Sequence, residues 1–569
     1  MQGRPARPSG SGRAPAGARP ASTVQGLVER NRDTPRPRTA REVEVRRNRV
    51  IVGGGVLAVL VLFVGFCTRV ADDDGTTTAT GGGTEEAQDA NGGEDGGDGG
   101  GGDVEATPTT EGLAPEAPEG FDGWVDPASS GKPWSTEVVG QLTFRGNPTR
   151  SYYGLGPVPK APEVQWQYPE SGGMCGNSPV GGENKTWCGS GWTGQPSAWK
   201  EGDRTWVALG AYDKKIHFFD AATGESVIDD FDIGDIVKGS VTRDPDGFPL
   251  LYSGSRADFH VIATDRDGGP ESLWSLDAEA VSPTKWNDDW DGSPLIVDDH
   301  LFEGGENGQI HIVKLNRAMG DDGKVTVDPQ LVFNAPGWDD ELLDDLSGSG
   351  SRVNDVSIEN SVAISGNTLY FSNSGGLVQG WDIAGLKEGE APTRTFRYWT
   401  GDDTDASIVI DEEGMLYVAQ EVERDSSSAR NAEVGQLVKL DPTKPDDPLV
   451  WSVADAGGMW ATPALWKGVV VAPTDSGRIV GVDRETGDVL WEKDLPGPTW
   501  SSPVIVDDVW VQGDCNGVLH GFDMADPRTE PPSLWEVQLE GCVESTPTVF
   551  DGQIFVGARG GKFYSLGDG

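Results

Sequence analysis

Four carboxylates, two tryptophans and one lysine lie at equivalent points of a repeated pattern, two or three residues before a position that leads into a short apolar run. Carboxylates at such points can ligate Ca²⁺ or act as general bases, and a tryptophan can stack against a planar ring. If the pattern brings these points together, they form one polar rim with two adjacent tryptophans. The seven residues are Lys238, Asp291, Glu359, Asp405, Trp460, Trp500 and Glu544.

The repeat that carries these residues is visible in TWSSPVIVDDVWVQGDCNGVLHGFD (499–523) and in MWATPALWKGVVVAPTDSGRIVGVD (459–483). Both copies contain a Trp, two small residues, a Pro, an apolar strand, a Gly-containing turn, a second apolar strand and an Asp. Matching positions follow one another at spacings of 45, 53, 67, 46, 56, 40 and 44 residues. They are Pro196, Val241, Pro294, Ser361, Ser407, Pro463, Pro503 and Pro547.

Three short alternating strands follow each position, and a fourth strand usually carries a tryptophan, as in VLW at 489–491. Four strands at a period near 45 residues predict a β-propeller blade. The eighth blade has only three strands before residue 569, and EVQWQY (163–168) supplies the fourth. We therefore predict an all-β fold: an eight-bladed propeller of four-stranded blades, closed by an N-terminal strand. A seven-bladed ring is the alternative, because the fourth blade matches the pattern least well.

The segment GRIVGVDRETGDVLWEKDL (477–495) resembles the pyrroloquinoline-quinone (PQQ) repeat, GxxxxxDxxTGxxxW, and HFFDAATGE (217–225) carries the same turn. Residues 144–169 are similar to the N-terminal segment of exported bacterial propellers of that superfamily. The resemblance implies a fold more than a function, because the superfamily holds quinone-dependent dehydrogenases as well as cofactor-free scaffolds. One such scaffold is the lipoprotein propeller of the outer-membrane β-barrel assembly machinery.

For the rim, the resemblance implies a quinone stacked on a tryptophan, Ca²⁺ on carboxylates such as Glu359, and an Asp as base. The sequence lacks the adjacent cysteine pair of quinone alcohol dehydrogenases, a CxxCH haem motif and their long insertions. We therefore expect a binding or scaffold propeller, without a cofactor, that recognises a protein or small ligand. A PQQ- and Ca²⁺-dependent dehydrogenase is the alternative. A hydrolase or lyase using rim carboxylates is a third hypothesis, with neither a nucleophile elbow nor a His-based triad to support it.

Two other residue types can bind metals. Four histidines occupy one position of the third strand in four blades, and equivalent positions around a ring cannot meet at one ion. These histidines are His217, His260, His311 and His520. The acidic stretch GWDDELLDD (337–345) lacks the twelve-residue Ca²⁺ loop with its closing Glu, so we interpret it as a solvated turn.

The cysteines predict two disulfides, since an exported compartment permits them. Cys175 and Cys188 flank one loop before the first blade, whereas Cys515 and Cys542 belong to neighbouring blades on one face. We predict the pairs Cys175–Cys188 and Cys515–Cys542. A zinc site built from all four has the wrong spacing. We expect the two disulfides to rigidify one face of the propeller, either to form a binding surface or only to stabilise the fold.

The N-terminal part divides by composition. Residues 1–49 hold twelve Arg and four acids, which predicts a disordered cytoplasmic tail. Residues 50–68 contain an uncharged 18-residue run, preceded by arginines, that predicts a single-pass transmembrane signal anchor. A cleaved signal peptide or a lipoprotein signal ending at Cys67 are the alternatives. Residues 69–120 predict an acidic, Gly-rich flexible linker.

Residues 121–569 form the predicted propeller, with 32 basic and 74 acidic residues. This excess of negative charge argues against nucleic acid and against direct docking on anionic lipid. We expect a protein of the plasma membrane, with its N-terminus in the cytoplasm and its propeller extracytoplasmic. The expected partners are the membrane, through residues 50–68, and an extracytoplasmic protein or small molecule.

Overall fold

The structure, a computed structural model, describes residues 112–569 except for 116, 181–182, 193, 350–352, 424–428 and 456. The predicted tail (1–49), the predicted anchor (50–68) and most of the predicted linker lie outside these residues. Within the described part, no helix has the length and apolar character needed to cross a membrane. Contacts of the folded part begin before residue 121, since the Ala114 N–H donates to the Ser135 carbonyl at 2.8 Å.

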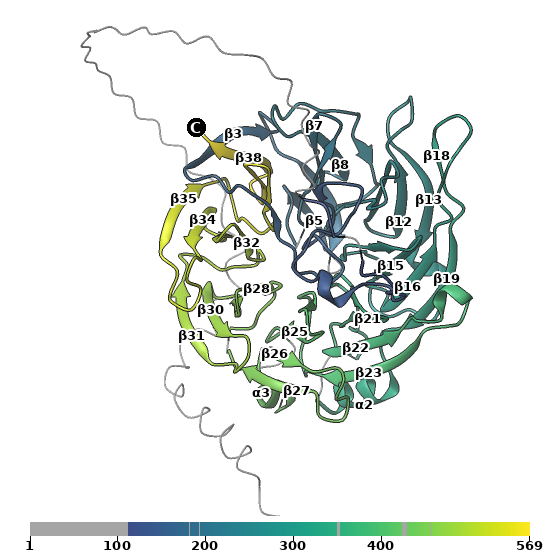
Figure 1. The fold of residues 1–569 in the computed structure, drawn as a ribbon, viewed down its shortest axis with the longest axis vertical. Helices are drawn as coiled ribbons and strands as arrows, with labels where there is room; N and C mark the ends of the chain where they lie inside the picture. Colours follow the sequence, from purple (N-terminus) through teal and green to yellow (C-terminus); the bar gives the residue numbers. More distant parts are fainter. Residues whose placement is uncertain are drawn as a thin grey trace, which may run out of the picture. The chain divides into compact units, whose positions relative to one another are not determined.

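Eight antiparallel sheets are arranged around a ring, and each is a meander of successive strands (Figure 1). This confirms the eight-bladed propeller and makes the seven-bladed alternative wrong. Blade 1 is β6 (Ser197–Glu201), β7 (Arg204–Gly210), β8 (Lys215–Asp220) and β9 (Phe231–Asp232); blade 2 is β10 (Thr242–Arg243), β11 (Leu250–Gly254), β12 (Asp258–Ala263) and β13 (Glu271–Asp277). Blade 3 is β14 (Leu295–Val297), β15 (His300–Gly304), β16 (Gln309–Lys314) and β19 (Gln330–Pro336); blade 4 is β20 (Ala363–Ser365), β21 (Thr368–Phe371), β22 (Leu377–Asp382) and β23 (Thr393–Trp399).

The remaining blades carry the clearest repeats. Blade 5 is β24 (Val409–Ile410), β25 (Leu416–Ala419), β26 (Leu437–Leu440) and β27 (Leu449–Val453); blade 6 is β28 (Ala464–Trp466), β29 (Val469–Pro473), β30 (Arg478–Asp483) and β31 (Val489–Asp494). Blade 7 is β32 (Val504–Val506), β33 (Val509–Gly513), β34 (Val518–Asp523) and β35 (Ser533–Gln538); blade 8 begins with β36 (Thr548–Phe550), β37 (Gln553–Ala558) and β38 (Lys562–Asp568).

An N-terminal strand completes blade 8, as predicted. β3 (Pro162–Tyr168) pairs antiparallel with β38, with Val164 opposite Leu566 and Tyr168 opposite Phe563. Figure 1 shows β3 beside β38, although the two strands lie at opposite ends of the folded sequence. The pairing leaves no unpaired edge on β38, where a row of free N–H and C=O groups would otherwise face solvent.

Several shorter elements lie outside the eight meanders. The helix α2 (Asp340–Ser349) replaces the solvated turn expected at 337–345, because Leu342 and Leu346 lie four residues apart and are both buried against Val356 and Leu377. The other elements are β1 (Gly140–Gln141), β2 (Gly154–Leu155), β4 (Cys175–Val180), β5 (Glu183–Cys188), β17 (Ala318–Met319), β18 (Val325–Thr326), α3 (Ala429–Val434), η2 (Pro127–Ser129), η3 (Ala278–Ala280) and η4 (Leu386–Glu388).

The tryptophan of a fourth strand joins its blade to the next one. The indole N–H of Trp451, on β27, donates to the Arg484 carbonyl of blade 6 at 3.0 Å. The indole of Trp166, on β3, donates to Ala221 of blade 1 at 2.8 Å. The glycine of the TG turn makes this approach possible, because a Cβ on Gly487 would lie 2.6 Å from the Trp451 ring. The repeated Trp and TG residues therefore form one contact, made between successive blades.

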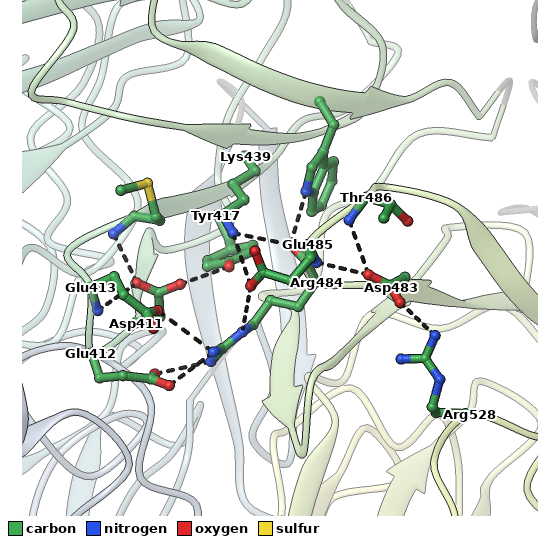
Figure 2. Close-up of polar contacts among 12 residues, drawn as sticks. Asp411, Glu412, Glu413, Tyr417, Lys439, Asp483, Arg484, Glu485, Thr486 and Arg528 are labelled. Atoms are coloured by element: carbon green, nitrogen blue, oxygen red, sulfur yellow. Dashed lines mark hydrogen bonds and ion pairs between the residues drawn. The ribbon is translucent and has the colours of Figure 1, made fainter.

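Charged groups reinforce the same junction (Figure 2). Arg484 forms a two-pronged ion pair with Glu412 of blade 5, at 2.8 and 2.9 Å. Asp483, the Asp of the repeat motif, accepts the Thr486 N–H at 3.0 Å and a guanidinium N–H of Arg528, in blade 7, at 2.6 Å. The ion pair with Arg528 and these backbone bonds lower the pKa of Asp483 to about 2. One DRETG turn thus contacts the blades on both sides of it.

The N-terminal segment fills the centre of the ring. Arg145 and Arg150 are fully buried and donate to backbone carbonyls of the innermost strands. Arg145 reaches Pro463 and Pro503, in blades 6 and 7, and Arg150 reaches Ser293 and Val362, in blades 3 and 4. Since these blades lie on different sides of the ring, the segment crosses the centre of the ring and ties them together.

The blade junction makes a testable prediction. Gly487→Ala should lower the free energy of unfolding by roughly 2–4 kcal/mol, because it combines a positive φ with a clash against Trp451. Gly414→Ala is the matched control: its φ is also positive, at 79°, but no atom lies within 4 Å of its added Cβ. Denaturant unfolding should therefore give a cost of only about 1 kcal/mol for the control. Equal costs for the two variants would contradict the role assigned to the Trp451 contact.

Candidate functional site

A cavity of about 770 Å³ opens at one mouth of the ring. Six of the seven rim residues predicted from the repeat line it, and the seventh, Asp291, lies directly behind Lys238 at 3.0 Å from its Nζ. Each of the six precedes the innermost strand of a different blade, which explains their convergence. They are Lys238, Glu359, Asp405, Trp460, Trp500 and Glu544.

Turns between second and third strands open on the same mouth and supply further lining residues. Glu306 follows β15, Glu421 follows β25, Asp475 follows β29 and Arg559 follows β37. The repeat alignment also specifies these turns, so it could have predicted them. Trp187, by contrast, belongs to the β4–β5 hairpin, which has no counterpart in the repeat, and Trp192 lies in the loop that enters blade 1, four residues before Pro196.

Lys238 lies in a cage of carboxylates on one side of the cavity. Its Nζ is 2.8 Å from Asp289, 3.0 Å from Asp291 and 2.6 Å from Glu306, and Lys238 is only 4% exposed. Burial alone would lower the pKa of Lys238, but the surrounding carboxylates outweigh it and raise the pKa well above its usual value. The Nζ also lies 4.8 Å from the centre of the Trp192 ring. The lysine is therefore a charged ammonium held by carboxylates and an indole face.

Three acids occupy the opposite side, around Trp460. The Trp460 indole N–H donates to Asp405 Oδ2 at 2.8 Å, and its backbone N–H donates to Asp475 Oδ1 at 2.9 Å. Burial raises the pKa of Asp405 and of Asp475 to about 6 in each case. Burial, then the charges of Asp405 and Asp475, raise the pKa of Glu421 well above its usual value. Nearby positive charge would favour the ionised form of all three acids.

Tryptophan rings form much of the wall, and they meet almost at right angles. Trp192 and Trp460 have centroids 5.6 Å apart with an interplanar angle of 81°. Trp460 and Trp500 are 6.0 Å apart at 84°. Edge-to-face contacts of this kind leave ring faces available to a ligand. The two tryptophans predicted to be neighbours are therefore in contact, and Trp192 extends the row.

Both predicted disulfides are present and brace this mouth. Cys175–Cys188 joins β4 to β5, the hairpin that brings Trp187 to the cavity. Cys515–Cys542 joins the β33–β34 turn to the segment before β36, and the Cys542 carbonyl accepts the Arg559 N–H at 2.9 Å. Arg559 in turn pairs with Glu544 at 2.8 Å.

The described residues contain three clusters of carboxylates, and in each cluster three side chains lie close enough together to hold a metal ion. The first, Asp289, Asp291 and Glu306, surrounds Lys238. The second, Asp411, Glu412 and Glu413, lies at a turn between first and second strands and contacts Arg484 (Figure 2). The third, Asp403, Asp405 and Glu421, is at the cavity, with ligand atoms within 4.8 Å of one another.

The four repeat-position histidines lie on third strands of four different blades, β8, β12, β16 and β34. None belongs to a candidate metal group of the described residues. His217 is instead held by Asp213 and Asp230, each at 3.1 Å; burial opposes its charge, but these two carboxylates raise its pKa to about 8.

Comparison with known proteins supports the repeat. Residues 433–530 match a family described as outer membrane protein assembly factor BamB. A curated BamB from Shewanella oneidensis is 36% identical over 90 residues, which is 16% of this chain and 22% of the relative's length. The match therefore spans less than a quarter of that protein.

Solved structures are similar over a larger share of the chain. BamB from Moraxella catarrhalis covers 65% of this chain and 95% of its own, with 15% identity and a TM-score of 0.45. Quinohemoprotein alcohol dehydrogenase from Comamonas testosteroni covers 75% of this chain and 80% of its own, with 12% identity and a TM-score of 0.50. At these identities the likeness concerns the fold.

The sheets and the closing strand define the class of the molecule, an eight-bladed β-propeller. Blades 1 and 6 carry the DxxTG turn, the fourth-strand tryptophan of the preceding blade contacts each of these turns, and the family match covers the second. Residues 433–530 therefore carry PQQ-like repeats of the matched family, within an eight-bladed β-propeller.

The raised pKa of Asp475 makes the stability of the protein depend on pH. The folded protein holds this proton more tightly than the unfolded chain, so the wild type loses stability as pH rises from about 4 to above 6. Asp475→Asn removes the effect and keeps an acceptor for the Trp460 N–H. Denaturant unfolding at pH 8 should show the variant to be more stable by roughly 1–3 kcal/mol, with little difference at pH 4. A variant that is less stable than wild type at pH 8 would contradict the raised pKa assigned to Asp475. Asp267→Asn is the control, because the Asp267 side chain is 96% exposed.

Proposed function

We propose that this protein is a membrane-anchored, extracytoplasmic binding propeller whose mouth cavity takes up a small ligand or a protruding side chain of a protein partner. The observation that carries the proposal is the cavity itself, because it is concave, walled by tryptophans and supplied with a few convergent charged groups.

The location outside the cytoplasm is supported by independent features. The two disulfides are of the kind that persists in oxidising compartments. The Arg-flanked apolar run within 50–68 has the length and charge asymmetry of a signal anchor. A scaffold role at a membrane also agrees with the printed name of the matched relatives, outer membrane protein assembly factor.

The residues at the mouth fit a quinone poorly. Pyrroloquinoline quinone carries three carboxylates, and each cationic side chain among the described lining residues already has an acidic partner. Lys238 is bound to three carboxylates, Arg559 to Glu544, and Arg256 to Asp288 at 3.2 Å. The close approach of Asp403, Asp405 and Glu421 is the one feature that favours the dehydrogenase alternative, because Ca²⁺ prefers such oxygens. We therefore propose that the protein binds its ligand at the mouth cavity without a resident cofactor.

Thermal melting of the full chain in mild detergent tests the proposal. The panel should contain organic cations, neutral sugars, divalent cations, and PQQ with Ca²⁺. We expect at least one class to raise the melting temperature of the wild type and not of a Trp460→Ala/Trp500→Ala variant, since specific binding stabilises the folded state.

The outcome of this panel decides between a binding propeller and a PQQ-dependent dehydrogenase. If no class stabilises the wild type in a tryptophan-dependent way, binding at the cavity is refuted. Stabilisation by PQQ only in the presence of Ca²⁺, lost in Asp405→Asn, would favour the dehydrogenase alternative. Accessibility of the propeller to protease added to intact cells tests the extracytoplasmic location, and protection of the propeller would contradict it.

A further inference from the structure

The described lining of the cavity is strongly acidic, and its positive charges are unevenly distributed. Nine acids and three basic residues line it. Two sides of the mouth each combine a tryptophan, carboxylates and a cation of the protein itself. On the first, Lys238 lies against Trp192; on the second, Arg559 lies 4.9 Å from the centre of the Trp187 ring and 2.8 Å from Glu544. The acids are Glu306, Asp355, Glu359, Asp403, Asp405, Glu421, Glu423, Asp475 and Glu544.

The Lys238 side shows how this mouth holds an ammonium ion. Three carboxylate oxygens lie 2.6–3.0 Å from its Nζ, and the indole face of Trp192 covers a further side. An ammonium over an indole is the favoured geometry for attraction between a cation and the electron-rich ring. Carboxylates then supply the full opposite charge that a ring face cannot.

The third side has the tryptophans and the carboxylates but no cation among the described residues. No described Lys or Arg lies within ion-pair distance of Asp405, Glu421 or Asp475, and none lies over the Trp460 or Trp500 ring. Asp405 lies beside the carboxylates of Asp403 and Glu421, and one of its oxygens accepts the Trp460 indole N–H. Carboxylates gathered beside indole faces repel one another in the free protein, and a cationic ligand relieves this repulsion.

We propose that the mouth cavity binds an organic ammonium ion between Trp460, Trp500 and the carboxylates of Asp405 and Glu421. This inference rests on the proposed binding function and names its ligand class. The ammonium belongs either to a free alkylamine or to a lysine side chain of a partner protein, which share this chemistry. Trp500 is 37% exposed and forms the side of the site that faces solvent.

Other ligand classes use only part of this arrangement. An anion would meet the excess of carboxylates and be repelled. A neutral sugar would stack on the tryptophans and leave the buried charge of Asp405 without a counter-charge. A bare divalent ion would use the carboxylates but would gain little from two apolar indole faces, because it binds through oxygen ligands. An alkylammonium ion contacts both.

Isothermal titration of the full chain with choline tests the proposal at pH 7.5, with 3,3-dimethylbutan-1-ol as the uncharged molecule of the same shape. We expect saturable choline binding and at least roughly tenfold weaker binding of the alcohol. Choline affinity should fall as salt is added, since the attraction is partly electrostatic. These comparisons use the wild-type protein, so they do not depend on the folding of any variant.

Variants then locate the site. Asp405→Asn keeps an acceptor for the Trp460 indole and removes the charge, and Trp500→Leu removes one ring; each should weaken choline binding roughly fivefold or more. Trp286→Leu changes another tryptophan of the same cavity, and Glu492→Gln changes an acid on the outer strand β31; both should stay within about twofold of wild type. Titration with a blocked lysine, and with its Nζ-acetylated form, distinguishes a protein side chain from a free amine.

The outcomes separate this inference from the proposed function. Equal affinity for choline and the alcohol, or weakening by Trp286→Leu but not by Trp500→Leu, would overturn the ammonium site. Displacement of choline by micromolar Ca²⁺, with unchanged Ca²⁺ affinity in Trp500→Leu, would replace it by a metal site. In each of these cases binding at the cavity stands. If neither choline nor any class of the melting panel binds, both proposals fail together.

Discussion

The contact between a fourth-strand tryptophan and the TG turn of the next blade is the constraint on which the rest of the structure depends. Trp451 enters the space left by Gly487 and donates to a backbone carbonyl of the same turn, and Trp166 repeats this contact with Gly224. The contact fixes how blade 6 lies against blade 5 and how blade 1 lies against blade 8. Because it lies at the outer part of the blades, it leaves the inner loops free to vary in sequence.

The mouth of the ring exists because the contacts between blades lie at the outer strands, away from the inner loops. The inner loops of successive blades meet at the mouth because the blades are held together at their outer strands. The segment around Arg145 and Arg150 crosses the ring beneath these loops. The resulting cavity is therefore built from residues far apart in the sequence. Its chemistry depends on how their charges balance: Lys238 is fully compensated by its neighbours, whereas Asp405 lies beside the carboxylates of Asp403 and Glu421.

The repeat contained enough information to predict the ring, its closure by residues 163–168, the Cys515–Cys542 disulfide and the convergence of the rim residues, whereas Cys175–Cys188 was predicted from two cysteines that flank one loop. The repeat could not predict Trp187, since the position of this residue follows from a hairpin outside the repeat, whereas Trp192 lies four residues before the repeat position Pro196. Nor could it show that Asp291 points at Lys238, because side-chain pairing between loops depends on the final backbone positions. The helix α2 was missed for a different reason. The acidic residues of 337–345 concealed the four-residue spacing of Leu342 and Leu346.

The pairing of β3 with β38 has a consequence for the order in which the protein is made. β3 leaves the ribosome before all the strands that lie between it and its partner β38 in the sequence. Until β38 has been synthesised, the seven complete blades lack a closed ring, and β3 is an unpaired strand in a growing chain. Ring closure therefore cannot precede the synthesis of β38, and the cavity at the mouth, which needs loops from both ends of the propeller sequence, forms only when that step is complete.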